Sequence, residues 1–313
     1  MKKVRVNTLE SRMKQYEATT DIGLVPKMPI VIRLDGKAFH TYTKGMKKPF
    51  DDILSETMIE TTKALCKDVH SCVFGYTQSD EITLILRLPD KIKSEEYYNG
   101  RLEKIVSLTA SKATRYFNKI FTEKVYKFKR LVEYTERRQR RLLEEAAENC
   151  DDNSLKEFQE NEVDLSSLEE NRALIKAYLK RAGDAEFDCR AWNMPEWDCI
   201  NSIVWRQKDA IRNSVEAVGH ANFSQSELYK LSVEEIKEKL LNEKGINWEE
   251  DFNVHQKMGV FCYKVIKTKE VDGENEEERK VIKRRYWETN RDNEMRITEN
   301  REWFAEVTGL SEK

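Results

Sequence analysis

Two acidic side chains stand beside short apolar runs, where they could hold a metal ion. Asp35 and Gly36 follow the apolar residues 29–34, and Asp80 lies in the polar segment 77–81. Carboxylate and carbonyl oxygens suit Mg²⁺, which takes further ligands from water and phosphates. Two such ions about 4 Å apart would activate an attacking oxygen and stabilise a leaving one. The alternative is that both are ordinary turn residues, because Asp-Gly and Ser-Asp are common turn pairs.

Several lysines follow the first carboxylate closely: Lys37, Lys44, Lys47 and Lys48. A metal-bound triphosphate needs nearby cations to neutralise its remaining charge. The pattern therefore favours a phosphate-binding segment, although a solvated lysine-rich loop has the same composition.

The elements that must position these groups follow from the spacing of apolar residues. Residues 29–34 are typical of a buried strand, and residues 52–69 and 95–121 have helical spacing. Residues 72–76 and 82–86 read as two strands of a hairpin, and residues 186–192 as a last strand. The order β-α-β-β-α-β predicts an α+β fold with a ferredoxin-like unit. Its first strand and central hairpin are neighbours, so Asp35 and Asp80 could meet at one edge of the sheet.

The excess charge of the chain lies between the second helix and the last strand. Residues 124–141 carry eight Lys and Arg, whereas residues 144–170 carry eleven Asp and Glu and one Lys. We interpret residues 122–184 as an inserted helical hairpin with oppositely charged arms. Two solvated helices that neutralise each other would explain the pattern. The other interpretation is that the basic arm contacts RNA phosphates.

The rest of the chain predicts a helical extension and a C-terminal hairpin. Residues 196–222 have helical spacing, and a second helix at 233–243 has a capping box at Ser232 and a stop at Gly245. Residues 260–266 predict a strand, and residues 267–285 a hairpin that turns at Asp272-Gly273. We therefore expect residues 1–121 and 185–266 to form a palm-like unit with its helical extension, 122–184 the insertion, and 267–313 a C-terminal hairpin and tail.

Composition narrows the class of protein. The chain has 313 residues, a net charge of −2 and 36% charged residues, so a nucleic acid would have to bind at a local basic patch. No apolar run reaches the ~20 residues of a membrane span, and the polar residues after the basic N-terminus lead us to expect no signal peptide. The six cysteines form no Cys-x-x-Cys pair, so we expect reduced thiols in a cytoplasmic protein rather than a zinc site.

Several motifs, in the right order, resemble those of the tRNA-His guanylyltransferase family. Arg33-Leu34-Asp35-Gly36-Lys37-Ala38-Phe39-His40 resembles its Arg-Leu-Asp-Gly-Arg-x-Phe-His signature, and Lys48-Pro49-Phe50-Asp51 its Lys-Pro-Asn-Asp segment. Gly75-Tyr76-Thr77-Gln78-Ser79-Asp80-Glu81 matches its hairpin, and Phe187-Asp188-Cys189-Arg190 is similar to its Phe-Asp-x-Arg strand. Trp205-Arg206-Gln207-x-Asp209 and Lys244-Gly245-Ile246-Asn247 follow in family order. The resemblance spans residues 28–121 and 186–266.

The resemblance implies a palm similar to that of polymerases, which extends tRNA at its 5′ end in the 3′–5′ direction. A 5′-monophosphate is activated with ATP, and the 3′-hydroxyl of GTP then attacks it. Asp35, the Gly36 carbonyl and Asp80 would hold two Mg²⁺, with Glu81 as a further catalytic candidate. Nucleotide-binding residues would be Asp35, Gly36, Lys37, Ala38, Phe39, His40, Lys48, Ser79 and Asp80. RNA-binding candidates are Arg206, Arg212 and Asn213, and relatives suggest a homo-oligomer, a dimer or tetramer.

The chain departs from the family pattern at two positions that bear on specificity. Ile211-Arg212-Asn213-Ser214 stands where the eukaryotic enzymes carry His-Ile-Asn-Asn, and Phe50 stands where Asn is usual. The first departure is similar to the bacterial, archaeal and phage relatives, which tend to repair tRNA 5′ ends against a template. Guanylylation of tRNA-His and general 5′-end repair therefore both stay open. A non-catalytic RNA-binding palm and a nucleotide cyclase are further alternatives from other classes.

Overall fold

The computed structural model describes residues 8–88, 93–149, 165–272 and 279–310. A six-stranded sheet runs in the order β4-β1-β3-β2-β5-β6, and every neighbouring pair is antiparallel. Its strands are β1 (Ile30–Gly36), β2 (Cys72–Gln78), β3 (Glu81–Leu86), β4 (Phe187–Asn193), β5 (Val260–Asp272) and β6 (Arg279–Thr289). With α3 (Asp52–Asp68) and α4 (Leu102–Asn149), the predicted order β-α-β-β-α-β is present as β1, α3, β2, β3, α4 and β4. The mixed α and β fold is thereby confirmed.

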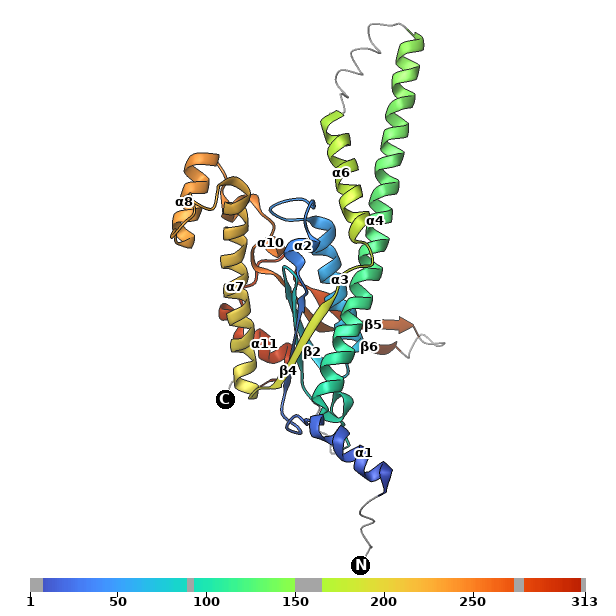
Figure 1. Cartoon of the computed structure of the whole chain (residues 1–313), viewed down its shortest axis with the longest axis vertical. Coiled ribbons are helices and arrows are strands. Elements are labelled where there is room, and N and C mark those ends of the chain that lie inside the picture. Colours follow the sequence, from blue (N-terminus) through green and yellow to red (C-terminus); the bar gives the residue numbers. More distant parts are fainter. Residues whose placement is uncertain (1–7, 89–92, 150–164, 273–278, 311–313) are drawn as a thin grey trace, which may run out of the picture.

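Alternation along the strands explains why helices cover both faces of the sheet. Ile32, Leu34 and Leu84 point to one face, where they pack with Leu65 of α3 and Phe117 of α4. Val31 and Ile85 point to the other face, against α7 (Glu196–Asn222) and α11 (Arg301–Thr308). Figure 1 shows this three-layer arrangement, with the sheet between α7 and α4.

The remaining elements are short or lie at the margins of the layers. They are α1 (Leu9–Glu17), η1 (Ala18–Thr20), α2 (Phe39–Tyr42), η2 (Tyr97–Gly100), α6 (Leu165–Arg181), α8 (Val233–Lys244), α9 (Trp248–Asp251), α10 (Val254–Met258) and η3 (Ile297–Glu299). The capping box at Ser232 is present, and Gly245 ends α8 with a left-handed backbone. No helix in the described part of the chain is long and apolar enough to cross a membrane.

Helix α4 does not end near residue 121, as the sequence predicted, but continues to Asn149. Its apolar stripe continues through Phe121, Val125 and Val132, all of which are buried. Helix α6 returns alongside α4, and its Tyr178 is 3% exposed within the same core as β1. Two helices do follow each other here, but their proximal halves belong to the core of the sheet domain. Only the distal halves extend beyond the palm (Figure 1).

The C-terminal region also differs from its prediction. Residues 260–272 form one continuous strand, β5, whose partner β6 pairs with it from Cys262 opposite Thr289 to Asp272 opposite Arg279. The predicted hairpin is therefore confirmed, although residue 273 of its predicted turn lies outside the described residues. Helix α11 was not predicted, because its segment is mostly polar. Phe304 of this helix is buried and stacks edge-on against Phe74 of β2 at 5.0 Å.

Candidate active site

The predicted meeting of Asp35 and Asp80 is present at one end of the sheet. The sequence predicted that the first strand ends before Asp35. In the structure, β1 includes Asp35 and Gly36, and Asp35 pairs with Glu81 of β3. The Gly36 N–H donates a hydrogen bond to the Asp80 carbonyl at 3.1 Å. The hairpin turn consists of Ser79 and Asp80 alone, with Ser79 at φ 49°. This tight turn brings Asp80 beside the end of β1.

The two carboxylates affect each other electrostatically. Burial, and next the negative charge of Asp35, raise the pKa of Asp80 above its usual value, while hydrogen bonds within the turn oppose the shift. Within the described ranges, no lysine, arginine or histidine forms an ion pair with either carboxylate. The same residues contain no cluster of three or more potential metal-binding side chains. The site therefore has two uncompensated carboxylates and nearby backbone carbonyls.

The segment after Asp35 is shaped by one close contact. A Cβ atom at Gly36 would lie 2.3 Å from the ring of Phe39, so only glycine fits there. Phe39 is 4% exposed and packs against Tyr42, Phe117 and Phe187. Its ring therefore anchors the segment in the core, and only its backbone is available to a nucleotide. The N–H groups of residues 38–40 donate no hydrogen bond among the described residues.

The other predicted nucleotide-binding residues lie around this segment. Lys37 is exposed and pairs with Glu186 at 2.5 Å, which raises the pKa of the lysine. His40 is exposed, with a ring nitrogen 3.0 Å from the Thr41 hydroxyl. Lys44, Lys47 and Lys48 are exposed and form no ion pair within the part of the chain that the structure describes. We call residues 44–48 the lysine loop.

Asp51 ties the lysine loop to two helices. It is buried, accepts hydrogen bonds from the Lys47 N–H at 3.0 Å and the Leu54 N–H at 2.9 Å, and so caps α3. The Tyr178 hydroxyl of α6 donates to the same carboxylate at 2.6 Å. Arg181, also of α6, donates to the Thr41 carbonyl at 2.9 Å. Helix α6 therefore supports the candidate phosphate-binding segment, a role that charge pattern alone did not indicate.

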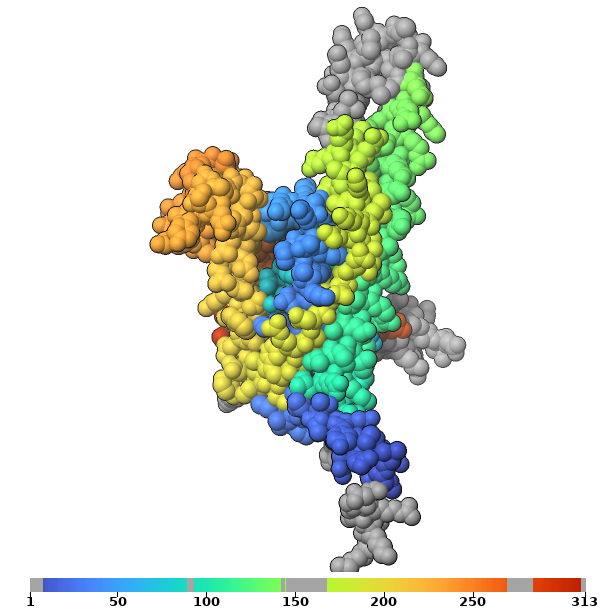
Figure 2. Space-filling view, in the orientation of Figure 1, coloured from blue at the N-terminus to red at the C-terminus, as the bar shows by residue number. Residues whose placement is uncertain are grey.

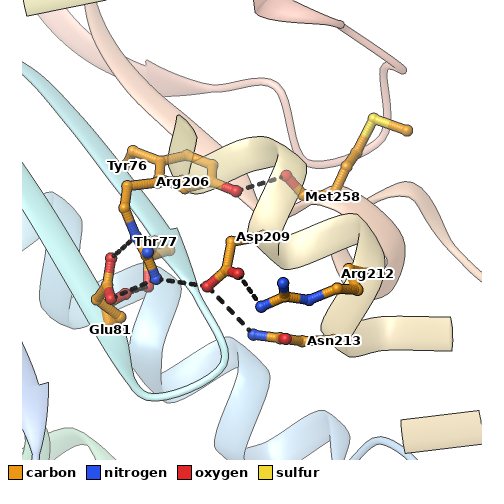
Figure 3. Close-up of polar contacts among 8 residues, drawn as sticks. All are labelled: Tyr76, Thr77, Glu81, Arg206, Asp209, Arg212, Asn213 and Met258. Atoms are coloured by element: carbon orange, nitrogen blue, oxygen red, sulfur yellow. Dashed lines mark hydrogen bonds and ion pairs between the residues drawn. The ribbon is translucent and has the colours of Figure 1, made fainter. Parts of the chain in front are cut away.

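Glu81, which lies opposite Asp35 in the pairing of β1 with β3, forms a buried ion pair with Arg206 (Figure 3). Arg206 of α7 donates from Nε to Oε1 at 2.6 Å and from Nη2 to Oε2 at 2.7 Å. Burial raises the pKa of Glu81, and the bidentate guanidinium of Arg206 opposes this shift. Arg206 also pairs with Asp209 at 3.0 Å. Both members of the Glu81–Arg206 pair are 8% exposed.

This pairing bears on the predicted RNA-binding residues. Arg206 is buried and joins the hairpin to α7 through its pair with Glu81. Arg212 is exposed and forms a short ion pair with Asp209. Asn213 donates a hydrogen bond to the same carboxylate at 3.5 Å. These two residues remain accessible beside the site. Gln207, which the sequence left without a role, binds the Met295 carbonyl and the Ile297 N–H.

Comparison with known proteins gives this geometry a context. A family model described as tRNAHis guanylyltransferase matches residues 10–150. A bacterial tRNA(His) guanylyltransferase-like protein, solved in complex with ATP, is 29% identical, with a TM-score of 0.68 over 97% of this chain and 100% of that one. Over these residues the chain is similar to the tRNAHis guanylyltransferase family of nucleotidyltransferases.

Other relatives show how far this likeness reaches. An uncharacterised protein of Acanthamoeba polyphaga mimivirus is 29% identical over 271 residues, which are 83% of this chain and 78% of that protein. The tRNA(His) guanylyltransferase of Candida glabrata is 33% identical over 120 residues, 35% of this chain and 46% of that enzyme. The match thus spans less than half of the fungal guanylyltransferase. The family model covers the segment from Asp35 to Asp80.

Proposed function

We propose that this protein adds nucleotides to the 5′ end of tRNA in the 3′–5′ direction, with Asp35 and Asp80 at the reacting centre. The observation that carries the proposal is the pair of uncompensated carboxylates at the sheet edge. The N–H groups of residues 38–40, which donate no hydrogen bond among the described residues, and the lysine loop follow Asp35 in the chain. An oxygen-rich site next to anion-binding groups suits a metal-bound triphosphate. The bacterial relative in complex with ATP supports the class of ligand.

The donor set fits a hard divalent cation. Ionisation of Asp80 carries a cost, because this residue is partly buried and lies close to Asp35, and a cation would offset that cost. Asp35, Asp80 and the Gly36 carbonyl would hold Mg²⁺, by our assignment two ions. Mg²⁺ would supply charge stabilisation at the transferring phosphate and a more acidic attacking hydroxyl.

The chain's own residues have separate tasks in this proposal. Lys48, Lys44 and Lys47 neutralise the phosphates, and Phe39 holds the backbone of the segment against the core. Glu81 and Arg206 fix the hairpin so that Asp80 faces β1. ATP would activate the 5′-monophosphate of tRNA. The 3′-hydroxyl of GTP, or of another nucleoside triphosphate, would then attack it and displace the activating nucleotide.

The structure favours templated addition as the refinement of this function. Both departures from the family pattern, Phe50 and Ile211, pack against the same apolar cluster, which includes Val215 and Trp248. Phe50 also stacks edge-on with Phe252 at 5.5 Å. The position of the eukaryotic histidine is thus used for packing, and an aliphatic side chain cannot hydrogen-bond a nucleotide. Nucleotide choice would then come from pairing with the opposite strand of the acceptor stem.

Primer-extension assays on paired tRNA transcripts test templating. One transcript carries C and the other A opposite the position to be filled, and the two are otherwise identical. We expect G to add at least ten-fold faster opposite C, and a 5′-truncated tRNA to be refilled with complementary nucleotides. Equal rates opposite C and A would contradict templating and favour strict guanylylation. No addition to either transcript would favour a non-catalytic RNA-binding palm.

A further inference from the structure

Helix α4 presents a regular row of tyrosine and arginine side chains on its outer face. Its members are Tyr126, Arg130, Tyr134, Arg137 and Arg141, spaced by four, four, three and four residues, and we call this row the outer stripe. This spacing keeps the side chains on one face of a helix. All five are exposed, Tyr126 by 49% and Tyr134 by 62%. Large exposed aromatics in such a row require an explanation other than core packing.

The opposite face of the same helix segment is fully committed to packing. Val125 and Val132 are buried, and Phe128 packs edge-on against Tyr178 of α6 at 6.0 Å. The outer stripe therefore points away from both α6 and the palm. Figure 1 shows that the distal half of α4 extends well beyond the sheet, so partners can reach this face from outside.

The arginines of the outer stripe have no carboxylate partner among the described residues. Arg130 and Arg137 donate only to the backbone carbonyls one turn earlier, those of Tyr126 and Glu133. Two acidic residues within the span of the stripe are engaged with other cations, Glu133 with Lys129 at 3.7 Å and Glu136 with Arg172 at 2.8 Å. Like charges one turn apart destabilise a helix unless something neutralises them.

We propose that the outer stripe binds the phosphate backbone of RNA, at a distance from the reacting 5′ end. Arginine forks match phosphate oxygens, and exposed tyrosines can contact sugars and bases. The stripe spans about 22 Å of helix, long enough to follow several phosphates of one strand. It contains no aliphatic residue, which argues against a membrane surface. This inference rests on the proposed function only for the identity of the RNA as tRNA.

A charge-removal variant of the full chain tests the proposal. Arg130→Gln, Arg137→Gln and Arg141→Gln are combined, and the matched control removes three exposed charges elsewhere, by Lys14→Gln, Lys67→Gln and Lys230→Gln. The dissociation constant for a full tRNA transcript is measured from 50 to 300 mM KCl. Each lost phosphate contact lowers the slope of log K against log salt by about 0.7–0.9. We expect the stripe variant to lose a slope of about 2–3, and the control less than about 1.

Two further measurements separate the possible outcomes. The rate of nucleotide addition at saturating tRNA should stay within two-fold of wild type, so a failed proposed function leaves the binding result readable. Tyr126→Ala with Tyr134→Ala should weaken binding several-fold at an unchanged salt slope, because no charge is removed. Equal slopes for the stripe variant and wild type would overturn the proposal in favour of a solvated face. An equal loss of slope in the control variant would also overturn the proposal. A change in oligomeric mass with an unchanged slope would overturn it too, and would indicate that the stripe contacts a protein.

Discussion

At the scale of single residues, the site depends on a contrast between two neighbouring acids of the hairpin. Asp80 is left without a cation, whereas Glu81 is neutralised by Arg206 through two short hydrogen bonds. The sequence alone could not separate their roles, because Asp80 and Glu81 are adjacent and equally acidic. Their difference comes from tertiary contacts: Glu81, the first residue of β3, meets Arg206 of α7, whereas Asp80 lies in the turn and meets no cation among the described residues. Asp80 and Asp35 are therefore the groups that should respond to a divalent cation.

Replacing Asp80 should have opposite effects on stability and activity. The folded pKa of Asp80 lies above the unfolded value, so the folded state binds more protons in that interval and loses stability as pH rises through it. Asp80→Asn should therefore raise the melting temperature of the metal-free protein at pH 7, and the gain should shrink as pH falls towards 4. Mg²⁺ should raise the melting temperature of wild type but not of the variant.

The same variant should lose nucleotide addition, because it lacks a ligand worth several kcal/mol in the transition state. Asp35→Asn should behave alike. Thermal melts at five pH values, with and without Mg²⁺, check the stability part, and turnover checks the rest. More than about a tenth of wild-type turnover, an effect below about 1.4 kcal/mol, would contradict the assignment of these carboxylates.

The Glu81–Arg206 pair should behave as a positioning device. Arg206→Met would leave Glu81 buried without a partner, at a cost of about 3–5 kcal/mol in the free energy of unfolding. Adding Glu81→Gln to that variant should recover part of the loss, with a coupling of about 0.5–3 kcal/mol. Arg212→Met is the matched control, since Arg212 is exposed and pairs with the same Asp209. Urea titrations of wild type, Arg206→Met, Glu81→Gln, the double variant and Arg212→Met measure these free energies of unfolding.

The outcome for Glu81 also distinguishes positioning from direct catalysis. If Glu81 only positions the hairpin, Glu81→Gln should keep more than a tenth of wild-type turnover. A folded Glu81→Gln protein of unchanged stability and no turnover would show that Glu81 acts on the substrate itself.

At the scale of elements, the sequence predicted the sheet better than the helices around it. Strands β1, β3 and β4 have dense apolar runs or motifs, and their order gave the meeting of Asp35 and Asp80. The end of α4 was missed because charged residues dominate its distal half, and only every third or fourth residue there is apolar. Helix α11 was missed because its burial depends on Phe74, a contact that no local pattern contains. Long-range pairing also decided the role of Arg206.

The packing of α4 and α6 determines which part of residues 122–184 can be deleted without unfolding the protein. Replacing residues 140–169 with a short Gly/Ser linker should leave a folded protein. The side chains of Glu136 and Arg172 already form an ion pair at 2.8 Å, so the linker has only a short distance to span between the two helices. Replacing residues 124–182 should instead give an insoluble or unfolded protein. That change removes Val125 and Tyr178 from the core and the hydrogen bond to Asp51. Circular dichroism melts of both variants check this. A stable, active 124–182 deletion would show that the whole segment is a separate insertion.

At the scale of the whole molecule, the candidate site lies between two flanking bodies. Helices α7 and α8 stand on one side of the sheet edge, and α2 with the α4–α6 pair stands on the other (Figure 1). The space-filling view shows a hollow between the blue segment that contains α2 and the gold α7 (Figure 2). The end of an RNA helix could enter this hollow while its backbone extends along the arm. We expect the protein to act as a homo-oligomer in the cytoplasm, as its family resemblance suggests.

Mapping the position of an added nucleotide tests whether this protein extends tRNA at its 5′ end with the help of Asp80. The protein is incubated with Mg²⁺, ATP, α-³²P-labelled GTP and a 5′-monophosphorylated tRNA that lacks its first nucleotide opposite C. Nuclease digestion then locates the label, with Asp80→Asn as the matched control. We expect the label at the 5′ end of the tRNA, and we expect labelling to depend on ATP, on Mg²⁺ and on Asp80. Label at the 3′ end, no label at all, or equal labelling by the Asp80→Asn protein would contradict the proposal.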